Sequence, residues 1–372
     1  MGATGTGSQL RIAMHLDNAP LSSGRSQSFA SRWCELASQR GIEVREVDAF
    51  GHGLLPSLQD CDGFMWCFWN APHNNELGRR LAMVMSHALH LPMFPDWRTC
   101  WFFEDKHSQR YLLEAAGVPM PRTWVFWDEK TAREFLASAS YPLVVKLAFG
   151  IVSANVRLVR GPAEAADLVR MLFGHGLTTL PRELGPGPAA WLRGRASNTL
   201  RALRGQRARE HLGIGPVQRG VVMFQEFLDG NAFDYRITVI GERAFGFRRF
   251  NRAGDFRASG SGSIDWNADD IEPEVVELAF ATARKLRSQV LALDILRRDG
   301  DLVVIEISYY YEAWAVHRCP GHWRRRADGA GLDWIGGEMR PEDAIFDDFV
   351  HGLRRPPSAD SAGAGTGAGG TR

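Results

Sequence analysis

The segment LALDILRRDGDLVVIEIS, residues 291–308, decides the fold of this chain. Residues 292–296 alternate like a strand, Arg298-Asp299-Gly300 is a turn signal, and residues 302–307 form a second apolar run. This pattern predicts a β-hairpin whose two strands are both apolar enough to be buried in a sheet.

Two acidic residues lie inside these apolar strands. Asp294 is in the first strand and Glu306 is in the second, where an ionised carboxylate is costly unless a cation or a metal balances it. A single acidic residue in such a strand is explained if its side chain lies on a solvent-exposed face of the sheet. Two acids on adjacent antiparallel strands, with Ser308 on the same face as Glu306, instead form the layout of a site for a hard cation. The hairpin therefore predicts that carboxylate oxygens converge on Mg²⁺, with nucleotide phosphates completing its shell.

Length and composition predict a multi-domain globular protein. A chain of 372 residues exceeds one comfortable core, and 45% hydrophobic and 23% charged residues are ordinary values. The formal net charge of +1 gives no global argument for a nucleic-acid or membrane partner. We find no apolar run near the roughly 20 residues of a membrane span and no secretory pattern, so we expect a cytoplasmic protein. The five scattered cysteines predict reduced, mostly buried thiols. They are Cys34, Cys61, Cys67, Cys100 and Cys319.

Strands that alternate with helices over residues 10–104 predict a small parallel α/β domain after a flexible tail, residues 1–9. The loops at its strand ends carry polar and aromatic side chains. They include Asp17, Asn18, Trp69, Asn70 and His73. Ligands in open α/β sheets bind at such ends, but loops are polar in any protein, so each of these residues alone indicates only a loop.

The rest of the chain predicts two further lobes. Helix and strand patterns cover 105–173 and 221–355, and a Pro/Ser/Ala/Gly-rich tail, expected to be disordered, covers 356–372. Between the lobes, residues 174–220 are rich in Gly, Pro and Arg. This insertion is expected to be solvated and partly helical, and a basic cap over an anionic substrate is the alternative. Lys146 ends an apolar strand, where it either extends to solvent or pairs with a phosphate.

Several motifs resemble those of the ATP-grasp ligases and occur in the same order. They are Lys106 in EDK, Lys146 at its strand end, FQEFL at 224–228, Asp234-Tyr235-Arg236, and the Asp294/Glu306 hairpin. NRAGDFRASGSG at 251–262 resembles the GDFRSN segment of the glutamate ligases that extend a ribosomal protein. Glutathione synthetase is similar too, and a little-characterised bacterial ATP-grasp group is the most similar. The resemblance spans about residues 101–308. It implies an N-terminal parallel α/β domain followed by a two-lobed α+β ATP-grasp module with the nucleotide between its lobes.

The resemblance also implies a role for each matching residue. Lys106 and Lys146 would reach the α- and β-phosphates of ATP, and Asp234 would accept from the ribose hydroxyls. A hinge strand would read adenine, mainly through its backbone. It comprises Gln225, Glu226, Phe227 and Leu228. The metal ligands, for Mg²⁺ or Mn²⁺, would be Asp294, Glu306 and Ser308. The γ-phosphate or the activated carboxylate would be held by Arg249, Asn251 and Arg257.

The implied activity is an ATP-dependent carboxylate–amine ligase that forms an acyl phosphate and releases ADP and phosphate. Its partners would be small-molecule or peptide carboxylates and amines, and a homodimer is compatible with the pattern. Two alternatives stay open. One is another ATP-grasp reaction, either phosphoryl transfer to a hydroxyl or thioester formation. The other is a nucleotide-binding protein with weak or no turnover.

Two positions depart from the family pattern. Ser308 stands where the family has Asn, and a hydroxyl is a shorter-reaching ligand. The phosphate-covering loop, residues 148–155, has one glycine, Gly150, where several normally let backbone N–H groups approach the nucleotide. The first difference implies metal contact through water, and the second a stiffer loop or reduced turnover.

Overall fold

The computed structural model describes residues 9–17, 19–20, 26–150, 155–180, 216–326 and 331–354. Most of the insertion predicted at 174–220 lies outside these residues, together with all of its clustered arginines. So do nearly all of the tail 1–9, the tail 356–372, and residues 151–154 of the phosphate-covering loop.

The N-terminal part is a parallel four-stranded sheet with helices, as the alternating pattern predicts. Its strands are β1 (Arg11–Met14), β4 (Glu43–Glu46), β5 (Gly63–Met65) and β6 (Met93–Phe94), in the order β4-β1-β5-β6. All three pairings are parallel. The longer helices are α1 (Phe29–Gln39) and α3 (Pro72–Val84), which continues into a π-helical turn, Met85–Leu89. Shorter elements are β2 (Ala19–Pro20), β3 (Ser26–Gln27), α2 (Leu54–Ser57) and α4 (Trp97–Cys100). Several of these short elements, including β6, are too short for a pattern to predict.

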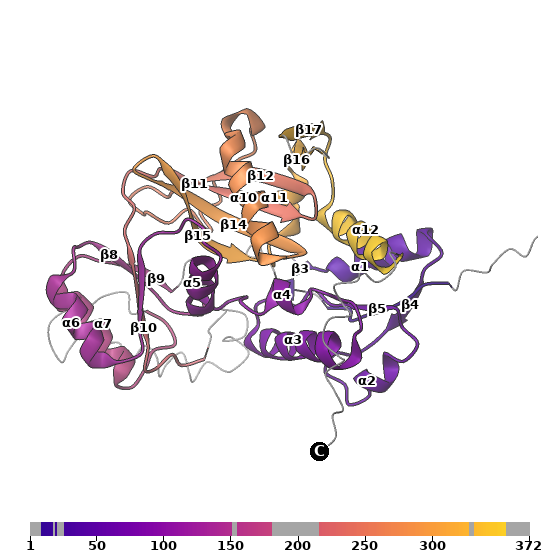
Figure 1. Ribbon diagram of the computed structural model, residues 1–372, viewed down its shortest axis with the longest axis horizontal. Coiled ribbons are helices and arrows are strands. Elements are labelled where there is room, and N and C mark those ends of the chain that lie inside the picture. The colour runs from indigo at the N-terminus through magenta and orange to yellow at the C-terminus, as the bar shows by residue number, and fades with distance from the viewer. Residues whose placement is uncertain are drawn as a thin grey trace, which may run out of the picture.

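The small lobe is an antiparallel sheet covered by two helices. Its strands β7 (Thr123–Phe126), β8 (Leu143–Lys146), β9 (Val156–Val159) and β10 (Val222–Glu226) have the order β7-β10-β8-β9. Helices α6 (Glu129–Ser138) and α7 (Pro162–Phe173) lie together at the left of Figure 1. Two helices begin with an aspartate cap: Asp105 accepts from Ser108 N at the start of α5 (Lys106–Ala115), and Asp128 accepts from Thr131 N before α6.

The large lobe contains the predicted hairpin within a sheet of order β15-β14-β11-β12-β16-β17. Its main strands are β11 (Phe233–Ile240), β12 (Arg243–Phe250), β14 (Val290–Arg298) and β15 (Asp301–Ser308). Helix α10 (Pro273–Leu286) packs its apolar face on β11. Strands β13 (Ile264–Asp265), β16 (Gly321–Arg325) and β17 (Leu332–Gly336), the turn Ala268–Asp270 and helix α11 (Ala313–His317) were not expected from sequence.

The last helix, α12 (Pro341–Arg354), packs against α1 of the N-terminal part, as Figure 1 shows. The guanidinium of Arg32 donates to both carboxylate oxygens of Asp343, at 2.8 and 2.9 Å. Trp33 Nε1 donates to Glu342 O at 3.1 Å. One continuous core therefore contains apolar residues from β1, α1 and α12.

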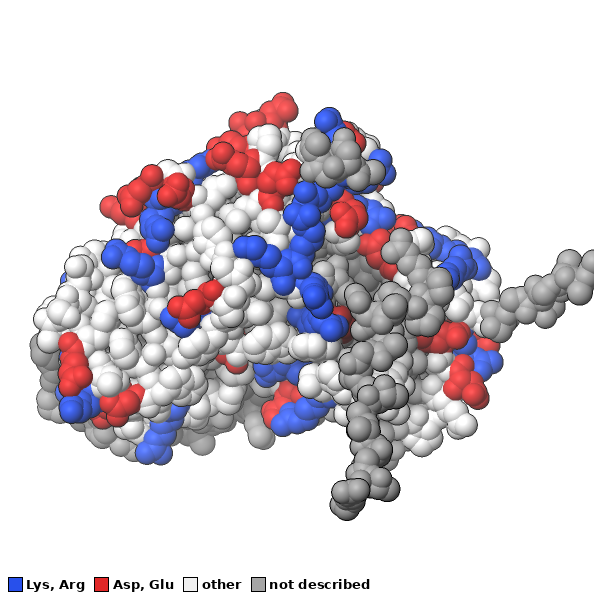
Figure 2. Space-filling view, in the orientation of Figure 1, with Lys and Arg blue, Asp and Glu red and all other residues white. Residues whose placement is uncertain are grey.

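Charges of both signs share the face drawn in Figure 2: acidic side chains gather near its upper edge, and a short run of basic ones lies below them. No single sign covers this face. Within the described ranges, we find no helix both long and apolar enough to cross a membrane. All five cysteines are free thiols, and Cys67, Cys100 and Cys319 are buried, as expected.

Candidate active site

A cleft that is open to solvent lies between the small and large lobes, and residues of both lobes line it. Ten of the thirteen residues predicted for the site line it. They are Lys146, Gln225, Glu226, Phe227, Leu228, Asp234, Asn251, Arg257, Asp294 and Glu306. Lys106, Arg249 and Ser308 lie outside its lining and are placed below.

The segment predicted to read adenine forms one wall of the cleft. Strand β10 ends at Glu226, and its side chain is held away from a ligand because it accepts from Arg122 N at 2.8 Å and Arg122 Nε at 2.6 Å. Arg298 Nη1 also donates to it, at 3.2 Å. Phe227 and Leu228 follow beyond the strand end and line the same wall. With its acidic side chain occupied, this wall offers a ligand mainly backbone groups and apolar surface.

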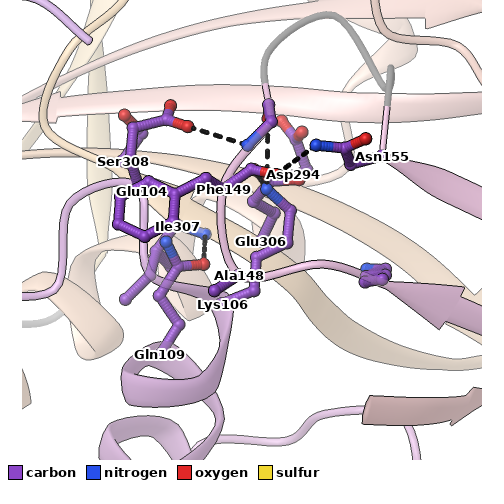
Figure 3. A network of polar contacts seen from close by, with 12 residues as sticks. Glu104, Lys106, Gln109, Ala148, Phe149, Asn155, Asp294, Glu306, Ile307 and Ser308 are labelled. Atoms are coloured by element: carbon purple, nitrogen blue, oxygen red, sulfur yellow. Dashed lines mark hydrogen bonds and ion pairs between the residues drawn. The ribbon is translucent and has the colours of Figure 1, made fainter. Parts of the chain in front are cut away.

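Two lysines from different elements meet at the other end of the cleft. Lys106 begins α5 and Lys146 ends β8, and both are buried, with 4% and 5% of their surface exposed. Lys106 Nζ lies 3.1 Å from Glu306 Oε1 (Figure 3), and the two lysines line one small adjoining cavity. The structure thus brings Lys106 to the site, although it does not line the main cleft.

Burial affects the two lysines differently. For Lys106, burial lowers the pKa, but the carboxylates of Glu306 and Glu104 outweigh it, and the net pKa is raised. For Lys146, burial dominates and the Lys106 charge adds to it, so its pKa falls to about 8 despite Glu306. The buried ammonium of Lys146 has little negative charge near it to balance its own, so it is well suited to bind a phosphate.

Asp294 lies at the centre of a buried network of carboxylates and guanidiniums. It is directly opposite Arg236 on β11 and Glu306 on β15. Arg236 donates to its two oxygens, at 2.5 Å from Nε and 3.1 Å from Nη2, and Arg249 Nη2 lies 2.8 Å from Oδ2. Burial alone would raise the pKa of Asp294, but these two guanidiniums lower it to about 2. The carboxylate is therefore ionised at every physiological pH.

Arg249 and Asp234 form a second directly opposed pair, between β12 and β11. Arg249 Nε and Nη2 donate to the two oxygens of Asp234, at 2.8 and 2.6 Å. Both side chains are buried. Arg249 thus lies beneath the cleft and ties Asp234 to Asp294, and the oxygens predicted to face ribose are engaged with its guanidinium.

The other two residues predicted to hold the reacting groups lie on the cleft wall. Asn251 Nδ2 donates to Asn231 O at 2.7 Å. Arg257 is bound to Asp255 through Nε and Nη2, at 2.9 and 2.7 Å, and its Nη1 donates to Val156 O of the small lobe at 3.3 Å. The GDFR segment therefore carries an arginine that reaches across the two lobes.

Ser308 and the phosphate-covering loop are engaged in local contacts. The Ser308 hydroxyl donates to Tyr310 O at 2.8 Å and accepts from Tyr310 N at 3.1 Å, so the structure does not bring it to the cleft. Gly150 is held between Lys106 Nζ, which donates to its carbonyl at 3.3 Å, and Asn155. A Cβ on Gly150 would lie 2.7 Å from Asn155 Cβ, so the one glycine stands where a side chain does not fit.

Two further functional candidates, Arg236 and Glu104, were not predicted from the sequence. Arg236 stands two residues after Asp234, on the same face of β11 and opposite Asp294, and this spacing could have identified it. Glu104 accepts from Gly150 N at 3.4 Å. Burial raises the pKa of Glu104 to about 7, against the effect of Lys106 and with that of Glu306. Its sequence signal was its place in the EDK motif. Figure 3 shows Glu104 and Lys106 with Asp294 and Glu306 in this network.

Comparisons with known proteins agree with this architecture. Residues 202–312 match the model of the RimK-like ATP-grasp domain. The comparison with curated protein sequences gives no match.

Three solved structures share the fold at low identity. D-alanine--D-alanine ligase from Bacillus anthracis, complexed with ATP, is 13% identical with a TM-score of 0.53, covering 93% of this chain and 98% of that chain. D-cycloserine synthetase DcsG is 15% identical with a TM-score of 0.53, covering 92% and 100%. The ATP-grasp ligase PsnB, complexed with minimal precursor, Mg and ADP, is 15% identical with a TM-score of 0.51, covering 92% and 98%. The fold class predicted from sequence is confirmed, and residues 202–312 match the RimK-like ATP-grasp domain, in agreement with the resemblance to the ATP-grasp ligases.

Proposed function

We propose that the protein is an ATP-dependent carboxylate–amine ligase that works through an acyl phosphate and releases ADP and phosphate. One observation carries the proposal. Four charged side chains from four different elements converge at one end of the cleft: Lys106, Lys146, Asp294 and Glu306. The hinge segment forms the opposite wall of this cleft. Phosphoryl transfer needs this arrangement of cations and carboxylates, because catalysis consists mainly of positioning and charge stabilisation.

The donor set fits Mg²⁺ bound together with a nucleotide. Asp294 and Glu306 offer hard carboxylate oxygens from neighbouring strands, and the described residues contain no group of three His, Cys, Asp or Glu able to hold a metal alone. A site of two carboxylates suits Mg²⁺, which takes substrate phosphates as its remaining ligands. When bound, the ion would neutralise charge on the β- and γ-phosphates. Mn²⁺ prefers similar ligands.

The residues of this chain then have distinct tasks. Lys106 and Lys146 bind phosphate oxygens, and the backbone of 225–228 holds adenine. Arg257 lies on the cleft wall and supplies positive charge that attracts the carboxylate substrate near the γ-phosphate. Asp234 and Arg236 orient Arg249 and Asp294, so they act through other residues. The free thiols fit a reducing compartment, and we place the enzyme in the cytoplasm.

The test is ADP release by the purified protein with a panel of carboxylates and amines, with and without Mg²⁺. We expect release that needs Mg²⁺, a carboxylate and an amine, with a product mass equal to the two substrates minus water. Glu306→Gln should remove most of this ADP release. Asp301→Asn, at the exposed first residue of β15 in the same hairpin, is the matched control and should retain the release. A phosphorylated hydroxyl product or a thioester product would show that the protein catalyses one of the alternative ATP-grasp reactions and not the ligase reaction. ATP binding without any turnover would leave a nucleotide-binding protein.

A further inference from the structure

The strand that carries Glu306 has a β-bulge directly before this residue. Strand β15 stands at one end of the strand order of its sheet, with β14 as its neighbour. Glu306 is opposite Asp294, and the next pair along the two strands is Val304 with Ile295. Ile305 is therefore an extra residue on the β15 side. Bulges redirect the side chains beside them and interrupt the hydrogen bonds between the strands. The direction of the Glu306 carboxylate thus depends on what holds β15 at this point.

Two side chains from outside the sheet hold the outer edge of β15, one on each side of Glu306. Lys146 Nζ, at the end of β8, donates to Ile305 O at 3.3 Å. Gln109 Oε1, on α5, accepts from Ile307 N at 3.4 Å, as Figure 3 shows. Both chain neighbours of Glu306 are therefore fixed by side chains that belong to other elements of the site.

The position of Gln109 on its helix connects this contact to the first lysine of the site. Gln109 stands three residues after Lys106 on α5, so the two side chains share one face of the helix. Gln109 is buried, and its Nε2 donates to Phe102 O at 3.3 Å. It also lines the small cavity that Lys106 and Lys146 share. Both ends of the Gln109 amide are thus engaged with backbone groups, which fixes its orientation.

The proposed function gives the two lysines a second task. Lys106 Nζ lies 3.1 Å from Glu306 Oε1, and Lys146 Nζ is bound to Ile305 O. When these ammonium groups bind phosphate oxygens, their contacts with β15 are shared or lost. Gln109 has no charge that attracts a phosphate, so its hydrogen bond to β15 remains. Without such a contact the bulged strand could slip by one residue, which would turn Glu306 to the opposite face of the sheet.

We propose that Gln109 is a positioning residue for the metal site: it holds the bulged end of β15 so that Glu306 keeps facing the cleft while the two lysines bind phosphate. This inference rests on the proposed function and adds a residue on which the Mg²⁺ affinity depends. Gln109 acts through the backbone next to Glu306. Removal of a side chain that orients a metal ligand typically weakens metal binding about ten- to a hundredfold.

The test measures metal binding separately from nucleotide binding. A fluorescent, non-hydrolysable ATP analogue is first bound to the purified protein without Mg²⁺, and Mg²⁺ is then titrated into the complex. Gln109→Met keeps the length of the side chain but loses both hydrogen bonds. We expect its half-saturating Mg²⁺ concentration to rise about tenfold or more, while its affinity for the analogue without Mg²⁺ stays within about twofold of wild type.

Gln289→Met is the matched control. Gln289 directly precedes β14 and also joins two backbone groups, since its Oε1 accepts from Asp96 N at 2.8 Å and its Nε2 donates to Met93 O at 3.1 Å. This variant loses the same kind of hydrogen bonds away from the cleft lining, so it should keep the wild-type response to Mg²⁺. Gln109→Asn is the second test variant. It keeps a polar amide but is too short to reach Ile307 N, and it should show the same Mg²⁺ shift as Gln109→Met.

The role of Gln109 is refuted if its variants respond to Mg²⁺ as wild type does, or if Gln289→Met shows an equal shift. It is also refuted if the affinity for the analogue without Mg²⁺ falls by the same factor. Failure of the ligase proposal has a different outcome: wild type binds the analogue with Mg²⁺ but releases no ADP from ATP with any substrate pair, and the Gln109 comparison still holds. If Mg²⁺ does not affect analogue binding to wild type, both proposals fail, because Glu306 then binds no metal.

Discussion

Asp294 and Glu306 lie directly opposite each other on β14 and β15, yet each is balanced by a different cation set. Asp294 faces two guanidiniums, those of Arg236 and Arg249, whereas Glu306 faces the ammonium of Lys106. One carboxylate is therefore part of a rigid buried network. The other, with a third of its side chain exposed, is free to exchange partners.

This difference predicts different effects on stability for two isosteric substitutions. Asp294→Asn leaves two buried arginines short of a counter-charge and should lower the free energy of unfolding by about 3–5 kcal/mol. Glu306→Gln should leave stability within about 1 kcal/mol of wild type and remove most turnover, because a metal ligand is lost. Urea unfolding and ADP release measure the two effects. Equal destabilisation by both changes would contradict the distinction.

Lys146→Met should stabilise the ligand-free protein while it weakens ATP binding. The folded-state pKa of Lys146 is lowered to about 8 from 10.5, chiefly by burial, so the charged form opposes folding. We expect the variant to be about 1–3 kcal/mol more stable at pH 7. The gain should shrink between pH 8 and 10.5, where wild-type lysine loses its proton in the folded and then in the unfolded state. Thermal unfolding across this range checks the sign, and calorimetry with ATP should show lower affinity. Lower stability at pH 7 would refute the argument.

Gly150→Ala should weaken ATP binding through the loop backbone. Because the new Cβ would lie 2.7 Å from Asn155 Cβ, either Asn155 or Gly150 must move, and the Lys106 hydrogen bond to the Gly150 carbonyl moves with it. Gly352→Ala is the control, since a Cβ there meets nothing within 4 Å. It should leave the ATP affinity unchanged. Similar ATP affinity for both variants would show that the loop tolerates a side chain.

Arg257→Lys should reduce kcat about ten- to a hundredfold with little change in ATP affinity. Lysine keeps the charge but loses the fork that binds Asp255 and reaches Val156. Arg248→Lys is the comparison, because Arg248 pairs with Asp265 and Asp270. Steady-state kinetics with the identified substrate pair measures both. A wild-type kcat in Arg257→Lys would assign this arginine to the support of its own segment.

Asp17→Asn should stabilise the protein above pH 6. The pKa of Asp17 is raised from 3.8 to about 6 by burial, so the ionised form opposes folding by about 2–3 kcal/mol at neutral pH. Below pH 3.8 the carboxyl is protonated in both states and the gain should vanish. Melting temperatures of wild type and variant from pH 3.5 to 8 check this trend. A gain of the same size at every pH would mean that the carboxylate charge is irrelevant.

Much of the fold was predictable because its elements are locally encoded. Strands β14 and β15 contain the two apolar runs predicted for the hairpin, and Asp105 and Asp128 cap their helices through side chains that are typical of that position. The elements that were missed, such as β6 and β13, have two residues each and exist through pairing with distant strands. A local pattern carries no information on such pairing.

The residues that form the site were largely predictable from the sequence, but the contacts between them were not. Acids placed inside apolar strands identified Asp294 and Glu306, since burying them needs a reason. The partners of those acids depend on strand register. Arg236 faces Asp294, and Arg249 joins Asp234 to it, only because β11 lies between β12 and β14. The Ser308 hydroxyl is turned to Tyr310 by backbone geometry that its neighbours in sequence do not reveal.

The contact between α1 and α12 also determines the order in which the chain can fold. Arg32 and Asp343 are 311 positions apart, so the pair forms after nearly the whole described chain has been synthesised. During synthesis, the apolar face of α1, which includes Trp33 and Phe29, therefore stays without its α12 contacts until α12 has been made. Contacts of such sequence separation form slowly, and exposed apolar surface is what chaperones bind. The N-terminal domain is thus made first and completed last.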